Sequence, residues 1–335
     1  MNMRHPRFGR RAALQALAGA AATAGAVPAW AQASTDAWPQ RPVKIVVPVA
    51  AGGIIDLLAR AVGEALTPSF KQPLVVESKP GADHLIGIQN VARSEPDGYT
   101  WLCASVPFTV NPAMRREPGY DPLKDFRPLS LIASNSNVLV VHPDLPVKTV
   151  AEFVSLAKSK PGALTYANPG NGSSNHLGME LFKSEAGLDI LGVVYKGQPP
   201  ALPDILAGRL DAMMMGSTVA MPHIKAGTLR PLGLVAAQRL PSLPDVPTMK
   251  ESGFPGVDVA PWFGLLLPSR TPEAIVRRAS TDLHAALQTS TLKKRIEDIG
   301  ATPYAPNSPA EFEQLIRAEL KKWPAVLSRA GIDKT

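Results

Sequence analysis

The sequence predicts an α/β fold in which mostly parallel sheets are flanked by helices. Short apolar runs of strand character alternate along the chain with segments of helical periodicity, and this alternation is typical of parallel sheets. The 335 residues also include 34 prolines, roughly twice the usual share of ~5%. Because proline ends helices, we expect many short elements joined by ordered turns, and long helical bundles are excluded.

The first half of the chain opens with a strand predicted over residues 43–48, an apolar run typical of a buried strand. A glycine-containing turn separates this strand from a helix predicted over 54–66. The same alternation then predicts a strand at 74–77, a helix at 86–94 and a strand at 100–105.

The second half resumes the pattern with a strand predicted at 138–141. Thr149, with Glu152 three residues later, forms a capping box, which predicts the start of a helix over 149–159. The remaining predicted elements are strands at 164–167, 193–195 and 212–215, a helix at about 175–186, and long amphipathic helices at 272–288 and 309–330.

Residues 1–31 have the features of an export signal. The basic pair Arg10-Arg11 precedes an apolar run of 16 residues, and Ala29-Trp30-Ala31 supplies the small residues of an A-x-A cleavage site. The run is too short and too rich in alanine to span a membrane comfortably. We therefore expect a signal peptide that is cleaved before Gln32.

The export route has two interpretations. Residues 9–14 are similar to a twin-arginine signal, and an ordinary secretory signal with two adjacent arginines explains the same residues equally well. No cysteine follows the apolar run, which excludes a lipoprotein. The mature chain is expected to be soluble in a bacterial periplasm.

Charge and composition exclude several classes of function. The formal net charge of +7 includes four arginines of the predicted signal and falls to +3 without them. No cluster of Lys and Arg with interleaved aromatics remains, so nucleic-acid binding is not indicated. The single cysteine, Cys103, excludes an internal disulfide, and the six histidines have no metal-site spacing. No metal or cofactor is predicted.

Two segments, residues 48–56 and 168–176, each combine a strand end, a glycine-rich turn and a helix start. In α/β sheets ligands bind beyond the carboxyl ends of strands, and the unpaired N–H groups of a helix start favour an anion. Neither segment is a phosphate loop, because GxxxxGK[ST] is absent. Either alone is explained by an ordinary βα connection, whereas two in separate halves indicate a cleft between two lobes.

About a dozen short motifs follow one another in order between Trp38 and Ile332. They include WPQRPVKIVVP at 38–48, GGIID at 52–56, VESKPGA at 76–82, DGYT at 97–100, GNGS at 170–173, YKG at 195–197, LPDVPT at 243–248 and WFG at 262–264. In this order the motifs resemble the substrate-binding proteins of tripartite tricarboxylate transporters, the Bug family.

The resemblance implies a two-lobed periplasmic binding protein fold, in which each lobe is a mostly parallel sheet flanked by helices. Lobe one would span 38–137 plus 262–335 and lobe two 138–261, with two hinge crossings between them. The resemblance also implies a small carboxylate as ligand, the permease subunits of a tripartite tricarboxylate transporter as partners, and no catalysis. A monomer is expected.

Backbone donors of the two glycine-rich loops are the main predicted ligand contacts. Micromolar binding needs about 8.2 kcal/mol, and a helix N-terminus contributes only ~0.3–1 kcal/mol. Hydrogen bonds to a charged group add ~1.5–3 kcal/mol each, so several donors must converge. The predicted contacts in the loops are Ala50, Ala51, Gly52, Gly53, Asn168, Gly170, Asn171, Gly172, Ser173 and Ser174.

Five further side chains are candidates, and four of them have two interpretations. Asp56 either favours the start of its helix or accepts from a ligand amino or hydroxyl group. His176 either caps its helix or contacts ligand, and Lys196 either is solvated or neutralises a second carboxylate. Met215 is either core or a strand end at the cleft, and Ser105 ends another strand.

The chain departs from the family pattern in its first lobe. Val49-Ala50-Ala51 replaces an aromatic residue and prolines, Ser78 stands where Asn is usual, and Gly81-Ala82-Asp83-His84 replaces Gly-Ala-x-Gly. The smaller first loop leads to the hypothesis that the pocket admits bulkier or aromatic carboxylates.

Two alternative functions remain open at this point. The same fold can present its ligand to a membrane sensor kinase instead of a permease, and exposed lobe residues do not separate these partners. An exported hydrolase is disfavoured, because no G-x-S-x-G occurs and the serines of Gly172-Ser173 and Gly216-Ser217 lack the second glycine.

Overall fold

The computed structural model describes residues 38–236 and 238–335. The predicted export signal at 1–31 lies outside the described residues. Pro39–Thr335 form one compact unit. None of the helices described in that unit combines the length and the apolar character needed to cross a bilayer.

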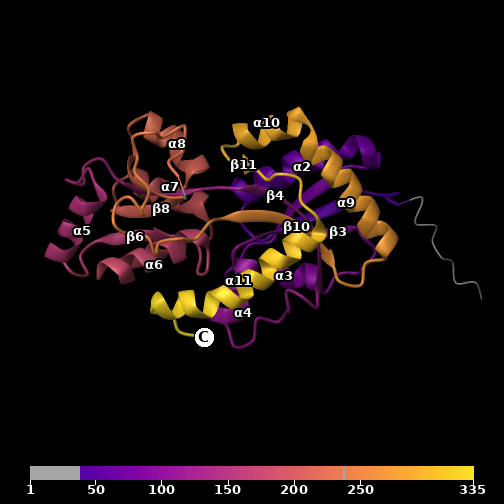
Figure 1. The fold of residues 1–335 in the computed structure, drawn as a ribbon, viewed down its shortest axis with the longest axis horizontal. Helices are drawn as coiled ribbons and strands as arrows, with labels where there is room; N and C mark the ends of the chain where they lie inside the picture. Colours follow the sequence, from indigo (N-terminus) through magenta and orange to yellow (C-terminus); the bar gives the residue numbers. More distant parts are fainter. Residues whose placement is uncertain (1–37, 237) are drawn as a thin grey trace, which may run out of the picture. The chain divides into compact units, whose positions relative to one another are not determined.

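Two mixed sheets organise the chain (Figure 1). The first has the order β11-β4-β10-β3-β1-β2 and the second the order β7-β6-β8-β5-β9. The strands of the first sheet are β1 (Val43–Val47), β2 (Leu74–Ser78), β3 (Thr100–Ser105), β4 (Phe126–Ser134), β10 (Trp262–Pro268) and β11 (Thr302–Pro303). Those of the second are β5 (Asn137–Val141), β6 (Thr165–Asn168), β7 (Leu191–Val194), β8 (Ala212–Gly216) and β9 (Arg230–Val235).

Each sheet has an interior strand, begun at a crossing between the sheets, that is antiparallel to both of its neighbours. In the first sheet β10 is antiparallel to β3 and β4, whereas β1 is parallel to β2 and β3. In the second, β5 is antiparallel to β8 and β9, whereas β6 is parallel to β7 and β8. The chain crosses between the sheets just before β5 and again before β10. A strand that begins at a crossing starts at the edge where its neighbours end, so it runs in the opposite direction.

Helices accompany both sheets, and α11 reaches from one to the other. Contacts of α11 with β4 and α4 lie at the first sheet, and its contact with α6 lies at the second (Figure 1). The helices that follow strands of the first sheet are α2 (Ile54–Phe70), α3 (Leu85–Ala92), α4 (Pro107–Met114), α9 (Glu273–Gln288), α10 (Ser290–Asp298) and α11 (Pro309–Arg329). Those of the second are α5 (Val150–Ser159), α6 (Ser174–Ala186), α7 (Gln198–Leu206) and α8 (Ser217–Lys225).

Local signals predicted several of these elements closely. The capping box is present: Thr149 Oγ1 accepts from the Glu152 N–H at 3.1 Å, and Glu152 Oε2 accepts from the Thr149 N–H at 3.2 Å. The helix predicted to end at residue 66 continues through Pro68 and ends at Phe70, and its C-cap Lys71 adopts a left-handed φ of 53°. Eight elements were not predicted from the sequence: β4, β9, β10, β11, α4, α7, α8 and α10.

A buried carboxylate joins α11 to the first sheet. Glu319 Oε2 accepts hydrogen bonds from Thr109 Oγ1 at 2.6 Å and from Trp262 Nε1 at 2.8 Å. Trp323 Nε1 donates in turn to Thr109 Oγ1 at 3.0 Å. Burial raises the pKa of Glu319 above its ordinary value, and these donors oppose the shift only in part. The network therefore ties α4, β10 and α11 together at the cost of a buried acid.

Candidate functional site

One cavity is lined by residues of both sheets and of the segments that connect their elements. Its wall is formed by residues at or just after the carboxyl ends of the parallel strands, and by the first residues of the reversed strands β5 and β10. The lining residues from the first sheet and its connections are Val49, Ala50, Gly53, Ile54, Ile55, His84, Ser105, Val106, Pro107, Pro261 and Phe263. Those from the crossing and the second sheet are Asn135, Asn137, Pro169, Ser173, Ser174, Asn175, Gly197, Gln198, Pro199 and Val219.

Five helices begin at this cavity. Their N-cap residues all line it: Gly53 for α2, His84 for α3, Val106 for α4, Ser173 for α6 and Gly197 for α7. The first N–H groups of a helix have no partner within the helix, and the helix dipole places positive potential at the same end. Converging N-termini of this kind favour an anion.

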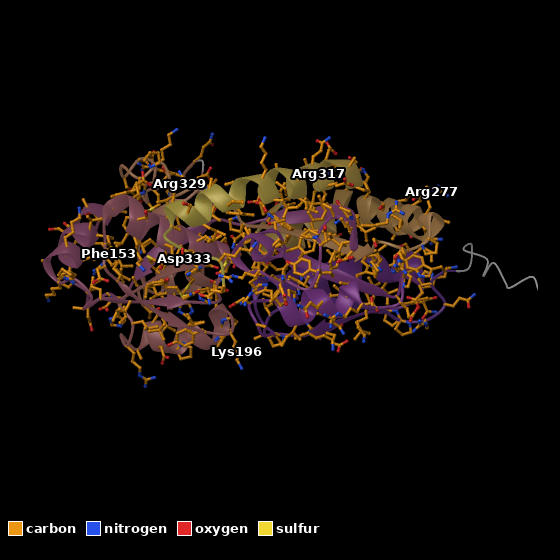
Figure 2. All side chains as sticks on the ribbon, turned by 90° about the horizontal axis from the view of Figure 1, so that it is seen from below. Phe153, Lys196, Arg277, Arg317, Arg329 and Asp333 are labelled. Carbon is orange, nitrogen blue, oxygen red and sulfur yellow. The ribbon has the colours of Figure 1, made fainter. Side chains whose placement is uncertain are left out.

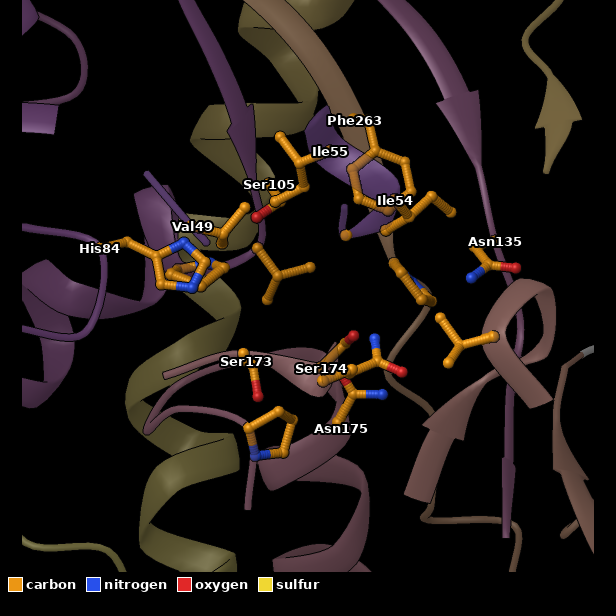
Figure 3. A pocket seen from close by; sticks show the side chains of 18 of the residues that line it. Val49, Ile54, Ile55, His84, Ser105, Asn135, Ser173, Ser174, Asn175 and Phe263 are labelled. Atoms are coloured by element: carbon orange, nitrogen blue, oxygen red, sulfur yellow. The ribbon is translucent and has the colours of Figure 1, made fainter. Parts of the chain in front are cut away.

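The cavity wall has no charged side chain among its lining residues. Its polar groups are the hydroxyls of three serines, the imidazole of His84 and four side-chain amides. Figure 3 shows Ser173, Ser174 and Asn175 on one side of the cavity, facing Ile54 and neighbouring apolar side chains on the other. A ligand would therefore meet neutral donors beside a largely apolar wall.

The structure brings five of the predicted contacts to this cavity. Ala50, Gly53, Ser105, Ser173 and Ser174 line it.

Two more predicted contacts line a neighbouring cavity. Gly170 and Lys196 lie there, and this second cavity shares Val49 and His84 with the first. Lys196 is exposed, and its side chain points outward from the surface (Figure 2).

Asp56 does not line the cavity. Its Oδ2 accepts from the Gly52 N–H and from Arg60 Nε, both at 3.1 Å, and its Oδ1 accepts from Arg60 Nη2 at 3.0 Å. Both oxygens are thus engaged, and the side chain is buried. Of the two interpretations, the geometry supports the one in which Asp56 holds the loop and the helix start.

The polar residues of the second loop mostly bind one another. Asn168 Oδ1 accepts from the Gly170 N–H at 3.0 Å, and Asn168 Nδ2 donates to Asn171 Oδ1 at 2.8 Å. The Gly172 N–H donates to His176 Nδ1 at 3.2 Å. Burial lowers the pKa of His176, which keeps this nitrogen available as an acceptor.

The remaining predicted contacts also lie outside the cavity wall. Met215 is fully buried in the core of the second sheet, because β8 is a central strand. Ala51 and Gly52 do not line the cavity either.

Sequence reasoning missed several residues of the cavity wall. A signal existed for Gly197 and Gln198, which follow a strand and begin a helix like the two predicted loops. No local signal marks Asn135, Asn137 or Phe263, because they reach the cavity through the two crossings.

No group of three His, Cys, Asp or Glu side chains that could hold a metal ion occurs within residues 38–236 and 238–335. Cys103 is a buried free thiol, and burial raises its pKa to about 12. This environment suits a small apolar core residue and not a nucleophile.

Two helix-flanked sheets that share one cavity lined by helix N-termini are the architecture of the periplasmic solute-binding proteins. The chain belongs to the tripartite tricarboxylate transporter family receptors, whose family model matches residues 58–332. Protein BugT of Bordetella pertussis is 33% identical over 312 residues, which cover 92% of this chain and 94% of that protein. The predicted family is thereby confirmed.

Solved structures of similar proteins agree with the fold. The periplasmic binding protein BugD is 32% identical with a TM-score of 0.85, covering 89% of this chain and 100% of that one. A protein of R. palustris solved with adipate is 35% identical with a TM-score of 0.85, covering 89% and 100%. MatC from Rhodopseudomonas palustris with bound malate is 32% identical with a TM-score of 0.82, covering 87% and 100%. The predicted α/β binding-protein fold is confirmed.

Proposed function

We propose that the protein binds a small carboxylate in this cavity in the periplasm and delivers it, chemically unchanged, to the permease subunits of a tripartite tricarboxylate transporter. In this proposal it acts as a monomer. Residues 38–137 plus 262–335 form lobe one, residues 138–261 form lobe two, and the lobes close on the ligand. The two separate sheets and the shared cavity support this division.

The observation that carries the proposal is the convergence of five helix N-termini on a wall without charged side chains. A carboxylate accepts hydrogen bonds from unpaired N–H groups and hydroxyls and gains from the dipoles. The same wall offers no carboxylate to a ligand ammonium, so α-amino acids are poor candidates. Bound adipate and malate in similar proteins support a carboxylate as the ligand class.

Release of an unchanged ligand is supported by the surroundings of the serines and histidines. Ser173 Oγ accepts from the backbone N–H of His176 at 3.2 Å and serves as an N-cap. His176 Nδ1 is occupied by the Gly172 N–H. His84 lines the cavity, and burial lowers its pKa to about 4. A triad needs a base that an acid orients, and these contacts do not provide one.

The first test is calorimetric titration of the purified protein after unfolding and refolding, which removes ligand carried from the cell. Straight-chain and aromatic carboxylates are compared with their uncharged primary amides. We expect carboxylates to bind at least tenfold more tightly than the amides. Equal affinity for both, or no affinity for any carboxylate, would contradict the anion site.

A charge variant locates the binding site. Ser174→Asp places an acid at the first residue of α6, where it suits the helix but repels a bound carboxylate. Ser290→Asp makes the same change at the first residue of α10, where the side chain is exposed. The first variant should lose carboxylate binding and the second should keep it. Retained binding in Ser174→Asp would place the ligand elsewhere.

The delivery step is tested in the strain that carries the protein. Deletion of its gene should abolish uptake of the carboxylate that binds, and cell fractionation should find the mature protein in the periplasm. Normal uptake with a lost transcriptional response to that carboxylate would favour a sensor as the partner.

A further inference from the structure

We infer that the side-chain amino groups of Asn135, Asn137 and Gln198 form a donor-only subsite at one end of the cavity. This subsite selects ligands that carry a second group able only to accept hydrogen bonds, a carboxylate or a ketone carbonyl, in addition to the anchoring carboxylate. The inference rests on the proposed function and adds to it the residues that recognise the far end of the ligand.

The oxygens of all three amides are already engaged by the protein. Gln198 Oε1 accepts from the Gly216 N–H at 2.8 Å. Asn135 Oδ1 accepts from Ser217 Oγ at 2.6 Å, and Asn137 Oδ1 accepts from Asn175 Nδ2 at 2.9 Å. Because a backbone N–H can only donate, the Gly216 contact determines which end of the Gln198 amide is the oxygen.

The amino groups of the same amides have no hydrogen-bond partner among the described residues. Asn137 Nδ2 is buried without a partner, in a residue that is only 1% exposed. Asn135 is 9% exposed, and both Asn135 and Gln198 line the cavity. A buried donor without a partner destabilises the protein, and a ligand acceptor that bonded to Asn137 Nδ2 would relieve this effect.

The three amides meet around Gly216. A Cβ atom at Gly216 would lie 3.0 Å from Asn135 Nδ2 and 3.2 Å from Gln198 Nε2. Asn137 is the residue opposite Gly216 in the antiparallel ladder of β5 and β8. Since the φ of Gly216 is −59°, an ordinary value, glycine is needed here for the space between the amides.

The hydrogen-bonding capacity of the subsite determines which ligand groups it binds. Each amino group offers N–H donors and no lone pair. A carboxylate or carbonyl oxygen satisfies these donors, whereas an ammonium would place donors against donors and a methyl group would leave them unpaired. Neutral amides recognise an acceptor without requiring a full negative charge, so a ketone should also bind.

The test first titrates the α,ω-dicarboxylates from succinate to suberate against refolded protein to find the chain length that binds best. At that length, analogues with an ω-methyl ketone, an ω-amino group or an ω-methyl group replace the second carboxylate. We expect the dicarboxylate and the ketone to bind at least tenfold more tightly than the ω-amino and ω-methyl compounds.

A substitution then reverses the preference. Gln198→Glu keeps an oxygen for the Gly216 N–H and replaces the free amino group with a carboxylate oxygen. This variant should lose at least tenfold in affinity for the dicarboxylate and gain affinity for the ω-amino compound. Gln314→Glu adds the same charge on the exposed face of α11. This variant should bind the compounds in the same order of affinity as the wild type.

These experiments distinguish a failure of the subsite from a failure of the proposed function. If monocarboxylates and dicarboxylates bind with equal affinity whatever the ω group, and Gln198→Glu keeps the wild-type order, the subsite is refuted while the carboxylate receptor stands. If no carboxylate binds, the proposed function itself fails. A loss of all binding in Gln198→Glu without the gain for the ω-amino compound also refutes the subsite, because a structural role alone would produce that loss.

Discussion

The Asp83 carboxylate accepts a 3.1 Å hydrogen bond from the backbone N–H of Asn171. Asp83 belongs to the turn between β2 and α3, and Asn171 to the glycine-rich loop between β6 and α6, so the bond joins the two halves of the fold. Arg115, the C-cap residue of α4, pairs with the other carboxylate oxygen of Asp83. Asp83 and Gly170 line the same cavity, next to the main one. This contact therefore stabilises the arrangement in which the two loops lie together.

Removing this acceptor should weaken ligand binding. Asp83 has a left-handed φ of 53°, so Asp83→Gly removes the carboxylate and leaves the turn unstrained. A net hydrogen bond contributes about 0.5–1.5 kcal/mol, which corresponds to roughly two- to tenfold weaker carboxylate affinity. Stopped-flow release of ligand should be faster by a similar factor. Asp97→Asn, which breaks the exposed pair with Arg41, is the control, and equal release rates in all three proteins would contradict the prediction.

Relief of backbone strain at His84 should stabilise the fold. His84 has a φ of 75° and caps α3 without a side-chain hydrogen bond to the helix. A left-handed conformation costs a residue with a side chain about 1–2 kcal/mol, and glycine avoids this cost. His84→Gly should raise the free energy of unfolding by about 1 kcal/mol in urea titrations at pH 7. His84→Ala keeps the strain, so a similar gain in that variant would assign the effect to another cause.

The same histidine should contribute to acid sensitivity. Burial lowers the pKa of His84 from 6.5 to about 4, so the folded state favours the neutral imidazole. This contribution to stability is complete above the ordinary pKa and is lost as the pH falls from about 6.5 toward 4. Urea titrations at pH 7 and pH 4.5 should show a smaller loss of stability in His84→Gly than in the wild type. Identical losses would show that His84 titrates normally.

Gly172 should tolerate no side chain, because α4 lies against it. Gly172 has a φ of 73°, and a Cβ atom there would lie 2.9 Å from Met114 Sδ and 3.1 Å from Val110 Cγ1. Gly172→Ala should therefore displace the loop and weaken carboxylate binding at least tenfold in calorimetry.

Gly187→Ala is the matched control for this effect. Its φ is 64°, and no atom lies within 4 Å of the added Cβ. It carries the left-handed strain alone, so it should lower the unfolding temperature and leave affinity unchanged. An equal loss of affinity in both variants would indicate general destabilisation.

Neutralising Glu319 should change how stability depends on pH. Burial raises the pKa of Glu319, so the folded state favours the protonated acid. The stability it contributes is complete below the unfolded-state pKa and is lost as pH rises through the raised folded value. Glu319→Gln keeps an acceptor for Thr109 and Trp262, so its stability relative to the wild type should increase between pH 4 and pH 8.

The exposed Glu311 should affect the pH dependence of stability in the opposite direction. Hydrogen bonds from Ser308 lower the pKa of Glu311, so its contribution is present at neutral pH and lost on acidification. Glu311→Gln should lose stability relative to the wild type over the same rise in pH. If both variants changed in the same direction in chemical denaturation, the assigned causes would be wrong.

Residues close together in the chain determined what the sequence alone could predict. Thr149 and Glu152 form their capping box within one turn of helix, and Gly52-Gly53 and Gly172-Ser173 mark helix starts through local backbone geometry. These features depend on φ, ψ and neighbours within about four positions, so a sequence displays them directly. The family motifs, which follow one another in the same order along the chain, extended this local information to the overall fold.

Only the tertiary structure decided which side chains face the cavity. Asn135, Asn137 and Phe263 reach the cavity because two crossings place reversed strands at its edge. Asp56, in a family motif, is instead turned toward Arg60 and the Gly52 N–H. Such roles depend on pairing between strands far apart in the chain, where register selects the face a side chain occupies. Local sequence rules do not contain that information, and for this reason Ser173 and Ser174 could be predicted near the cavity, whereas the amides around Gly216 could not.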